Sequence, residues 1–85
     1  MSDDYSATAE EQLDDLEAGP DVDLYNAIIE ACETIFVAPA IAQTLSTALQ
    51  TRDGIVLRLP VAGHPPYKLF WSTAGPRIEA VFPHE

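Results

Sequence analysis

The side chains that could do chemistry lie in the last third of the chain, in residues 54–84. Apolar and polar residues alternate there, and a period of two places each set on its own face of a sheet. The set opposite the main apolar one consists of Arg58, Lys68, Phe70, Arg77, Glu79 and Val81. Lysine and arginine contact carboxylates or phosphates, and arginine offers a planar fork for paired hydrogen bonds. The pattern therefore indicates a face that binds an anionic partner, with Lys68, Phe70 and Arg77 as binding residues.

A plainer interpretation of the same residues stays open. Arg58, Lys68 and Glu79 on neighbouring strands also predict a solvated surface held by cross-strand ion pairs. His64, which precedes two prolines, is interpreted as a loop residue. Two distant histidines without cysteines or carboxylates at ligand spacing predict no metal site. No phosphate loop, serine elbow or catalytic triad pattern occurs, and we expect no cofactor.

Three strands must position this face. The alternation predicts strands at about residues 54–60, 66–73 and 76–83, with Ile78, Ala80 and Phe82 expected to point inward in the last one. Residues 39–50 are ambiguous, because the pattern fits a helix as well as a strand. A helix or turn over 39–46 and a strand over 46–51 is favoured, since Asp53-Gly54 is typical of a hairpin turn.

Two helices precede the strands. Residues 22–37 carry apolar side chains at three- and four-residue spacing, which predicts a helix. Asp21 or Asp23 is the candidate cap at its start, and the helix ends before Pro39. Residues 7–18 predict a short amphipathic helix that ends at Gly19-Pro20. Cys32 lies on the apolar side of the longer helix, which indicates a buried structural cysteine rather than a nucleophile. The predicted core consists of Leu24, Ile28, Ile35, Phe36, Leu57, Leu69, Trp71, Ile78 and Phe82.

The 85 residues suffice for one domain, divided into an acidic arm with a short helix (1–20) and a compact α+β part (21–85). Residues 1–23 hold nine of the 14 acids and no lysine or arginine, and the net charge is −10. This charge disfavours simple nucleic-acid binding, because acidic side chains repel a phosphate backbone. The segment is either a solvated, partly disordered lead or a surface that docks on a basic partner. The single cysteine and the lack of a membrane-spanning apolar run predict a cytoplasmic protein that does not enter membranes.

The order of elements resembles the RelE/ParE toxin superfamily of toxin–antitoxin systems. The residues that carry the resemblance are the helix LYNAIIEACETIF followed by Pro39, then GIVLRL, GHPPYKLFW and PRIEAVFPH. The resemblance implies an α+β fold in which a helical hairpin packs on a small antiparallel sheet. It also implies a toxin that acts on a macromolecular target and pairs with an antitoxin-like protein.

Ribonuclease members of this superfamily cleave mRNA with residues on the sheet, using a base, a cation and an acid. The resemblance implies that Arg58, His84 and Glu79 would be the catalytic residues, with RNA as a partner only in that case. Gyrase-inhibiting members share the fold without that set. Two functions therefore stay open, a toxin-fold protein and a noncatalytic acidic interaction module, and a homodimer is compatible with either.

Overall fold

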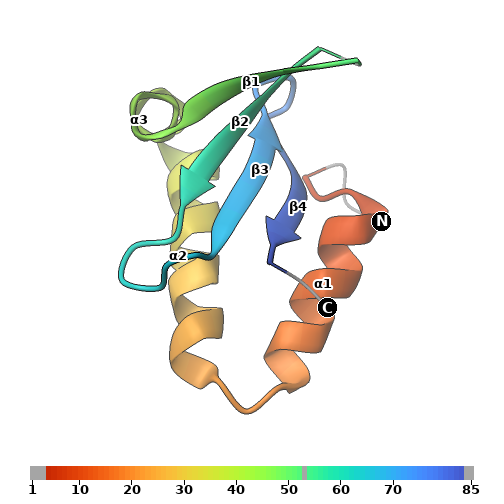
Figure 1. Ribbon diagram of the computed structural model, residues 1–85, viewed down its shortest axis with the longest axis vertical. Helices are drawn as coiled ribbons and strands as arrows, with labels where there is room; N and C mark the ends of the chain where they lie inside the picture. Colours follow the sequence, from red (N-terminus) through yellow and green to blue (C-terminus); the bar gives the residue numbers. More distant parts are fainter. Residues whose placement is uncertain (1–3, 53, 84–85) are drawn as a thin grey trace.

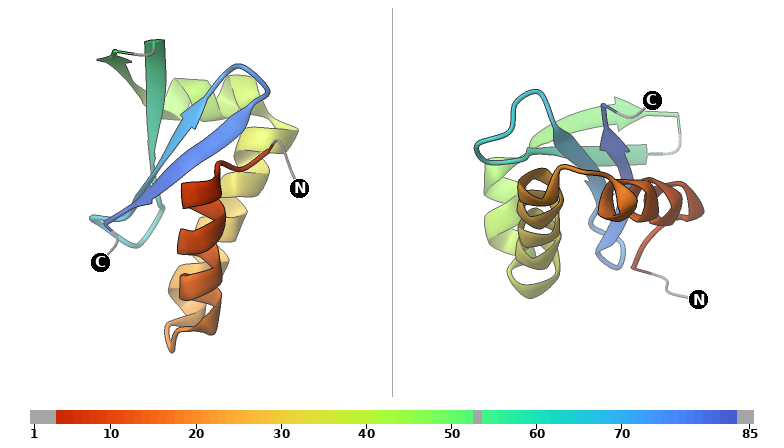
Figure 2. Two further views of the ribbon diagram at one scale, coloured as in Figure 1. Left: turned by 90° about the vertical axis from the view of Figure 1, so that its right-hand side faces the viewer. Right: turned by 90° about the horizontal axis from the view of Figure 1, so that it is seen from below.

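The computed structural model describes residues 4–52 and 54–83. Three helices precede a four-stranded antiparallel sheet of order β1-β2-β3-β4, which confirms the α+β class (Figure 1). The elements are α1 (Ala7–Ala18), α2 (Val22–Val37), α3 (Pro39–Leu45), β1 (Thr47–Thr51), β2 (Gly54–Pro60), β3 (Lys68–Ser72) and β4 (Arg77–Phe82). The two longer helices lie on one face of the sheet and leave the other face without a helix (Figure 2). Among the described residues no helix is long and apolar enough to cross a membrane.

Side-chain caps fix where the helices begin. The hydroxyl of Ser6 accepts a hydrogen bond from the Ala9 backbone N–H at 3.0 Å, and Asp21 accepts one from Leu24 at 3.1 Å. Each cap satisfies a donor that the first helical turn leaves without a partner. Both helices have the bounds that the sequence predicts. Residues 39–50 divide as favoured, with Pro39 in the first turn of α3 and β1 directly afterwards.

The hairpin between β1 and β2 forms as the sequence indicates. Thr51 pairs with Gly54, and the Thr51 hydroxyl donates to the Gly54 carbonyl at 2.8 Å. Gly54 has a φ of 127°, a backbone conformation that L side chains rarely adopt. This glycine allows the chain to reverse and to bring residues 47–51 into the sheet as its outer strand.

A β-bulge in β4 reverses the alternation that the sequence predicts. Trp71 pairs with Ile78 and Phe70 pairs with Ala80, so Glu79 is an extra residue without a partner on β3. Past this point Val81 points into the core and is fully buried, whereas Phe82 lies on the opposite face with 43% of its surface exposed. The predictions that Ala80 points inward, that Phe82 belongs to the core and that Val81 points outward are therefore wrong, because Ala80 pairs with Phe70 on the face opposite the core.

The core lies between the helices and the covered face of the sheet. Seven of the nine predicted core residues are buried there: Leu24, Ile28, Ile35, Leu57, Leu69, Trp71 and Ile78. Phe36 is half-buried at the margin, where its ring meets Tyr5 edge to face at 5.5 Å. The indole of Trp71 donates to the Ser46 hydroxyl at 3.1 Å, so its polar atom is satisfied inside the core.

The acidic segment is folded from residue 4 onward, and α1 packs on β4 rather than forming a partly disordered lead. The buried side chain of Gln12 accepts a hydrogen bond from the Val81 backbone N–H at 2.7 Å. Residues before α1 form a short parallel bridge between Tyr5 and Ile78, in which Ser6 N–H donates to the Ile78 carbonyl and Ile78 N–H donates to the Asp4 carbonyl. One edge of the sheet is therefore covered by the start of the chain.

Replacing Ile28 by alanine should lower the free energy of unfolding by about 2–5 kcal/mol, because its side chain is fully buried. Urea denaturation followed by circular dichroism measures this loss. The matched control is Val22→Ala in the same helix, which is 63% exposed and should change stability by less than about 0.5 kcal/mol. Equal effects of the two substitutions would show that the buried face of α2 is assigned incorrectly.

The bulge makes a second prediction. Val81→Asp should unfold the domain or lower its free energy of unfolding by several kcal/mol, since an isolated charge would be buried. Phe82→Asp at the next position should leave a folded protein. Thermal melts of both variants decide between the observed register and an uninterrupted alternation, which requires the reverse order of stability.

Candidate functional site on the open sheet face

The sheet face without helices, called the open face from here on, gathers four of the notable side chains at one end. Arg58 on β2 pairs with Phe70 on β3, and Lys68 on β3 pairs with Phe82 on β4. Arg58 and Lys68 are both half-buried, and each long side chain lies beside an aromatic neighbour. The strand register therefore brings Arg58, Lys68 and Phe70 together, as the sequence predicts.

Phe70 and Phe82 form the apolar part of this end. Their ring centroids are 5.1 Å apart and the rings meet edge to face at 84°. This geometry is favourable for aromatic pairs and fixes the orientation of both rings. The sequence pattern missed Phe82, because a strict alternation assigns it to the core. No residue in 77–82 signals this change of face, because the alternation there fits an uninterrupted strand equally well.

The two cations at this end have no ion-pair partner within residues 4–52 and 54–83. The ion pair in this part of the chain joins Arg77 Nε to Glu79 Oε2 at 4.0 Å, on partly exposed side chains. The predicted cross-strand set of Arg58, Lys68 and Glu79 is therefore not formed. Arg58 and Lys68 instead border a shallow hollow of about 270 Å³ that Tyr67 and the prolines of the β2–β3 loop complete.

Arg77 lies at the other end of the sheet, and the Glu79 side chain is directed toward that end by its contacts with Ser72 and Arg77. The Ser72 hydroxyl donates to Glu79 Oε2 at 3.0 Å. Arg77 and Glu79 both border a separate hollow beside Thr51 and Gly54. Strand β3 lies between Glu79 on β4 and Arg58 on β2. The expected catalytic carboxylate and the expected catalytic arginine therefore flank β3 and form no ion pair with each other. The third expected catalytic residue, His84, lies outside the described residues.

The histidines and the cysteine are the other candidates for a metal or catalytic site. No group of three histidine, cysteine or acidic residues there could hold a metal ion. His64 lies in the β2–β3 loop, where its backbone N–H donates to the Val61 carbonyl at 3.2 Å. Its predicted position in a loop is confirmed.

Cys32 is buried in α2, as the sequence predicts. Burial raises the pKa of its thiol to about 12, and a hydrogen bond with Tyr5 offsets only part of this effect. A thiol with a pKa in that range stays protonated and unreactive near neutral pH. Cys32 is a packing residue of the core.

Comparison with known proteins gives no family for this chain: no family model matches it, and neither a curated protein nor a solved structure does so. The resemblance to the RelE/ParE superfamily stays a prediction that rests on the order of elements and on short sequence segments.

The buried thiol predicts a loss of stability at alkaline pH. The folded protein keeps the Cys32 proton up to about pH 12, whereas the unfolded chain releases it above its ordinary pKa of 9.0. The free energy of unfolding should therefore fall as pH rises from 9 towards 12, by up to about 1.4 kcal/mol per pH unit. Burial also raises the pKa values of Tyr5 and Tyr25 above 10.0, which adds to the loss at higher pH.

Urea denaturation at several pH values between about 8 and 9 isolates the cysteine, because the tyrosines of the unfolded chain ionise mainly above that range. Cys32→Ala should give a flatter dependence on pH than the wild type, whatever its absolute stability. Parallel curves for the two proteins would show that Cys32 is accessible to water in the folded state.

Proposed function

We propose that the chain is a noncatalytic binding protein of RelE/ParE-like arrangement, which holds an acidic segment of a partner protein on its open face. The observation that carries this proposal is the pairing of two cations with two aromatic rings on a sheet face that no helix covers. Arg58 and Lys68 have no ion-pair partner within the described residues, and Phe82 is 43% exposed. An exposed aromatic beside charges of one sign is typical of a protein contact surface.

The chemistry of the open face fits carboxylates. The guanidinium of Arg58 offers two parallel donors that match a carboxylate, and Lys68 adds a second positive charge one strand away. Phe70 and Phe82 offer an apolar surface to a residue beside the bound carboxylate. A partner segment that alternates acidic and large apolar side chains satisfies both halves of this surface.

The charge distribution favours an acidic protein segment over a nucleic acid. Residues 1–51 contain 11 acids and no lysine or arginine, whereas residues 52–85 contain all four cations and three acids. A nucleic acid carries a phosphate at every nucleotide, so the helices would repel most of its length while two cations neutralised about two phosphates. A protein segment needs only one or two carboxylates at the open face.

The contacts that Glu79 already makes with Ser72 and Arg77 favour binding over catalysis. Cleavage of RNA needs a base and a cation at the same phosphate, within about 3 Å of the reacting atoms. Glu79 lies beyond β3 and already accepts a hydrogen bond from Ser72. A toxin–antitoxin role is one form of this proposal, in which an antitoxin-like protein would supply the acidic segment.

The test is an NMR titration with a synthetic peptide of about 12 residues composed of aspartate, glutamate, leucine and tryptophan. Arg58→Glu should weaken binding by about tenfold, which corresponds to the loss of a charge-assisted hydrogen bond. Arg52→Glu is the matched control, because Arg52 is exposed near the β1–β2 turn and the net charge changes equally. Its effect should stay below about twofold.

Three results would contradict the proposal. Equal losses in Arg58→Glu and Arg52→Glu would show that only net charge matters. Tighter binding of a uridine oligonucleotide that depends on Arg58, or mRNA cleavage on induced expression that Arg58→Ala abolishes, would assign the open face to RNA chemistry.

A further inference from the structure

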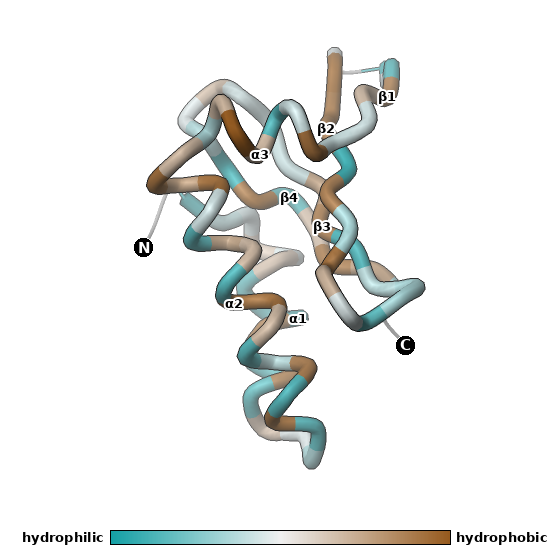
Figure 3. Tube along the Cα trace, turned by 90° about the vertical axis from the view of Figure 1, so that its left-hand side faces the viewer, coloured by the Kyte–Doolittle hydropathy of each residue, from teal (hydrophilic) through white to brown (hydrophobic). Residues whose placement is uncertain are grey.

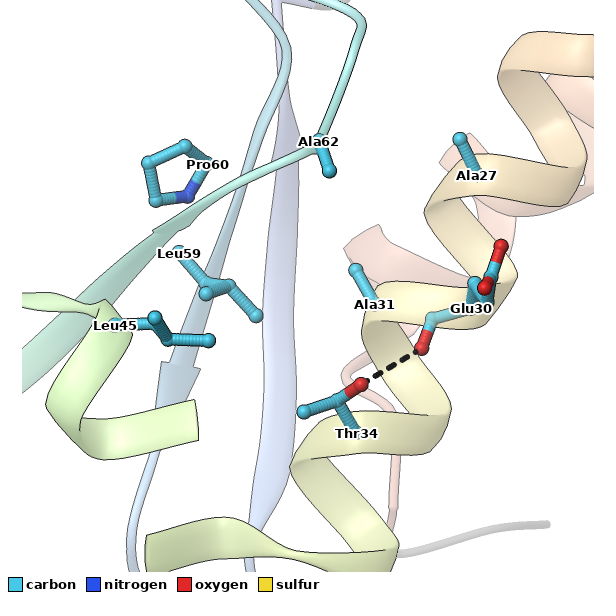
Figure 4. Close-up of a pocket in the computed structure, with 8 residues that line it drawn as sticks. All are labelled: Ala27, Glu30, Ala31, Thr34, Leu45, Leu59, Pro60 and Ala62. Atoms are coloured by element: carbon cyan, nitrogen blue, oxygen red, sulfur yellow. Dashed lines mark hydrogen bonds between the residues drawn. The ribbon is translucent and has the colours of Figure 1, made fainter. Parts of the chain in front are cut away.

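A groove of about 190 Å³ lies between α2, α3 and the end of β2 (Figure 4), and no aromatic side chain of the described residues lines it. We call it the α2–α3 groove. On one side the short side chains of Ala27 and Ala31 of α2 leave space beside the helix. The opposite wall consists of Leu45, Leu59 and Pro60, and Figure 4 shows the two walls facing each other across a gap. A space of this size between apolar walls accepts a side chain of a partner.

The groove has few polar side chains, and they differ in whether they are free to bind a partner. The Thr34 hydroxyl donates to the Glu30 backbone carbonyl at 3.2 Å, so it is satisfied within α2. The exposed carboxylate of Glu30 has no ion-pair partner among residues 4–52 and 54–83. The groove is therefore apolar inside and acidic at its rim.

Large apolar side chains continue from the groove onto the surface of α3. Leu45 is 61% exposed and Ile41 is 58% exposed, and their spacing of four residues places them on the same face of the helix. Figure 3 shows brown segments in α3 although this helix lies at the surface. Exposed apolar side chains that adjoin an apolar groove mark a surface that a partner covers.

We propose that the α2–α3 groove binds a cationic amphipathic helix of a partner protein. A leucine, isoleucine or phenylalanine of that helix enters between Ala31 and Leu45, and its neighbouring residues cover Ile41. Lysine or arginine residues beside it pair with Glu30 at the rim. This is helix-in-groove recognition, in which apolar anchors one turn apart give affinity and charges give selectivity.

Charge complementarity favours this partner over a second copy of the chain. A two-fold dimer across the groove would place each rim against the same rim, and would bring two molecules of net charge −10 together. No lysine or arginine occurs in residues 1–51 to neutralise this surface. A cationic helix removes the repulsion and buries the same apolar area. The site is distinct from the open face, which attracts the opposite charge.

The experiment measures binding of a fluorescent peptide of about 18 leucine and lysine residues, ordered as an amphipathic helix. A peptide of the same composition in scrambled order is the reference, and the wild type should bind it at least about tenfold more weakly. Leu45→Lys should weaken binding of the amphipathic peptide by about tenfold or more. Glu30→Lys should weaken it by about fivefold.

Each variant has a matched control. Val22→Lys makes the same change in charge as Leu45→Lys at a residue of similar exposure, 63%, outside the groove. Glu11→Lys repeats the charge reversal of Glu30→Lys on α1. Both controls should change binding by less than about twofold. Phe82→Ala on the open face should also leave the affinity for the amphipathic peptide unchanged. This result distinguishes binding at the groove from binding of an acidic segment at the open face.

Three outcomes would overturn the proposal. Equal binding of the scrambled peptide, or equal losses in a variant and its matched control, would show attraction to net charge alone. Dimerisation of the peptide-free protein in sedimentation experiments, lost in Leu45→Lys, would assign the groove to a second copy. Circular dichroism establishes that each variant is folded before its binding is interpreted.

Discussion

The extra residue at Glu79 in β4 determines what each face of this protein presents. Without it, Phe82 would enter the core and Val81 would face solvent. With it, the core receives a smaller β-branched residue and the open face receives a second aromatic ring, 5.1 Å from Phe70. A bulge re-aims every side chain that follows it in its strand. The aromatic pair and its position beside Lys68 thus depend on one local irregularity.

The bulged strand is also where the start of the chain is attached. Gln12 accepts the Val81 backbone N–H, and residues 4–6 hydrogen-bond to Ile78 on the other side of the bulge. An edge strand otherwise leaves such groups without partners and available to other chains. At the opposite edge, β1 pairs with β2 alone. The two edges of the sheet therefore differ, and the acidic segment contributes to the fold as well as to the charge of the surface.

The sequence predicts those parts of the structure that local patterns determine. The bounds of α1 and α2, the hairpin at Gly54 and the burial of Ile28 follow from capping residues, glycine and apolar spacing. The bulge could not be predicted, because alternation in residues 77–82 fits an uninterrupted strand equally well and the register is set by pairing with β3. The expected catalytic group stays a prediction: Arg58 and Glu79 lie on strands that flank β3, and His84 lies outside the described residues.

Lysine and arginine are absent from residues 1–51, so the helical layer is strongly negative, whereas all four cations lie in residues 52–85. The screening length is about 8 Å at physiological ionic strength, well below the shortest extent of the molecule, 23 Å. Under these conditions the open face acts through its own cations. At about 0.01 M salt the screening length grows to about 30 Å, and the field of the helices then reaches across the sheet. Added salt should at first help an anionic segment to approach, the reverse of the usual dependence, before it weakens the contacts themselves.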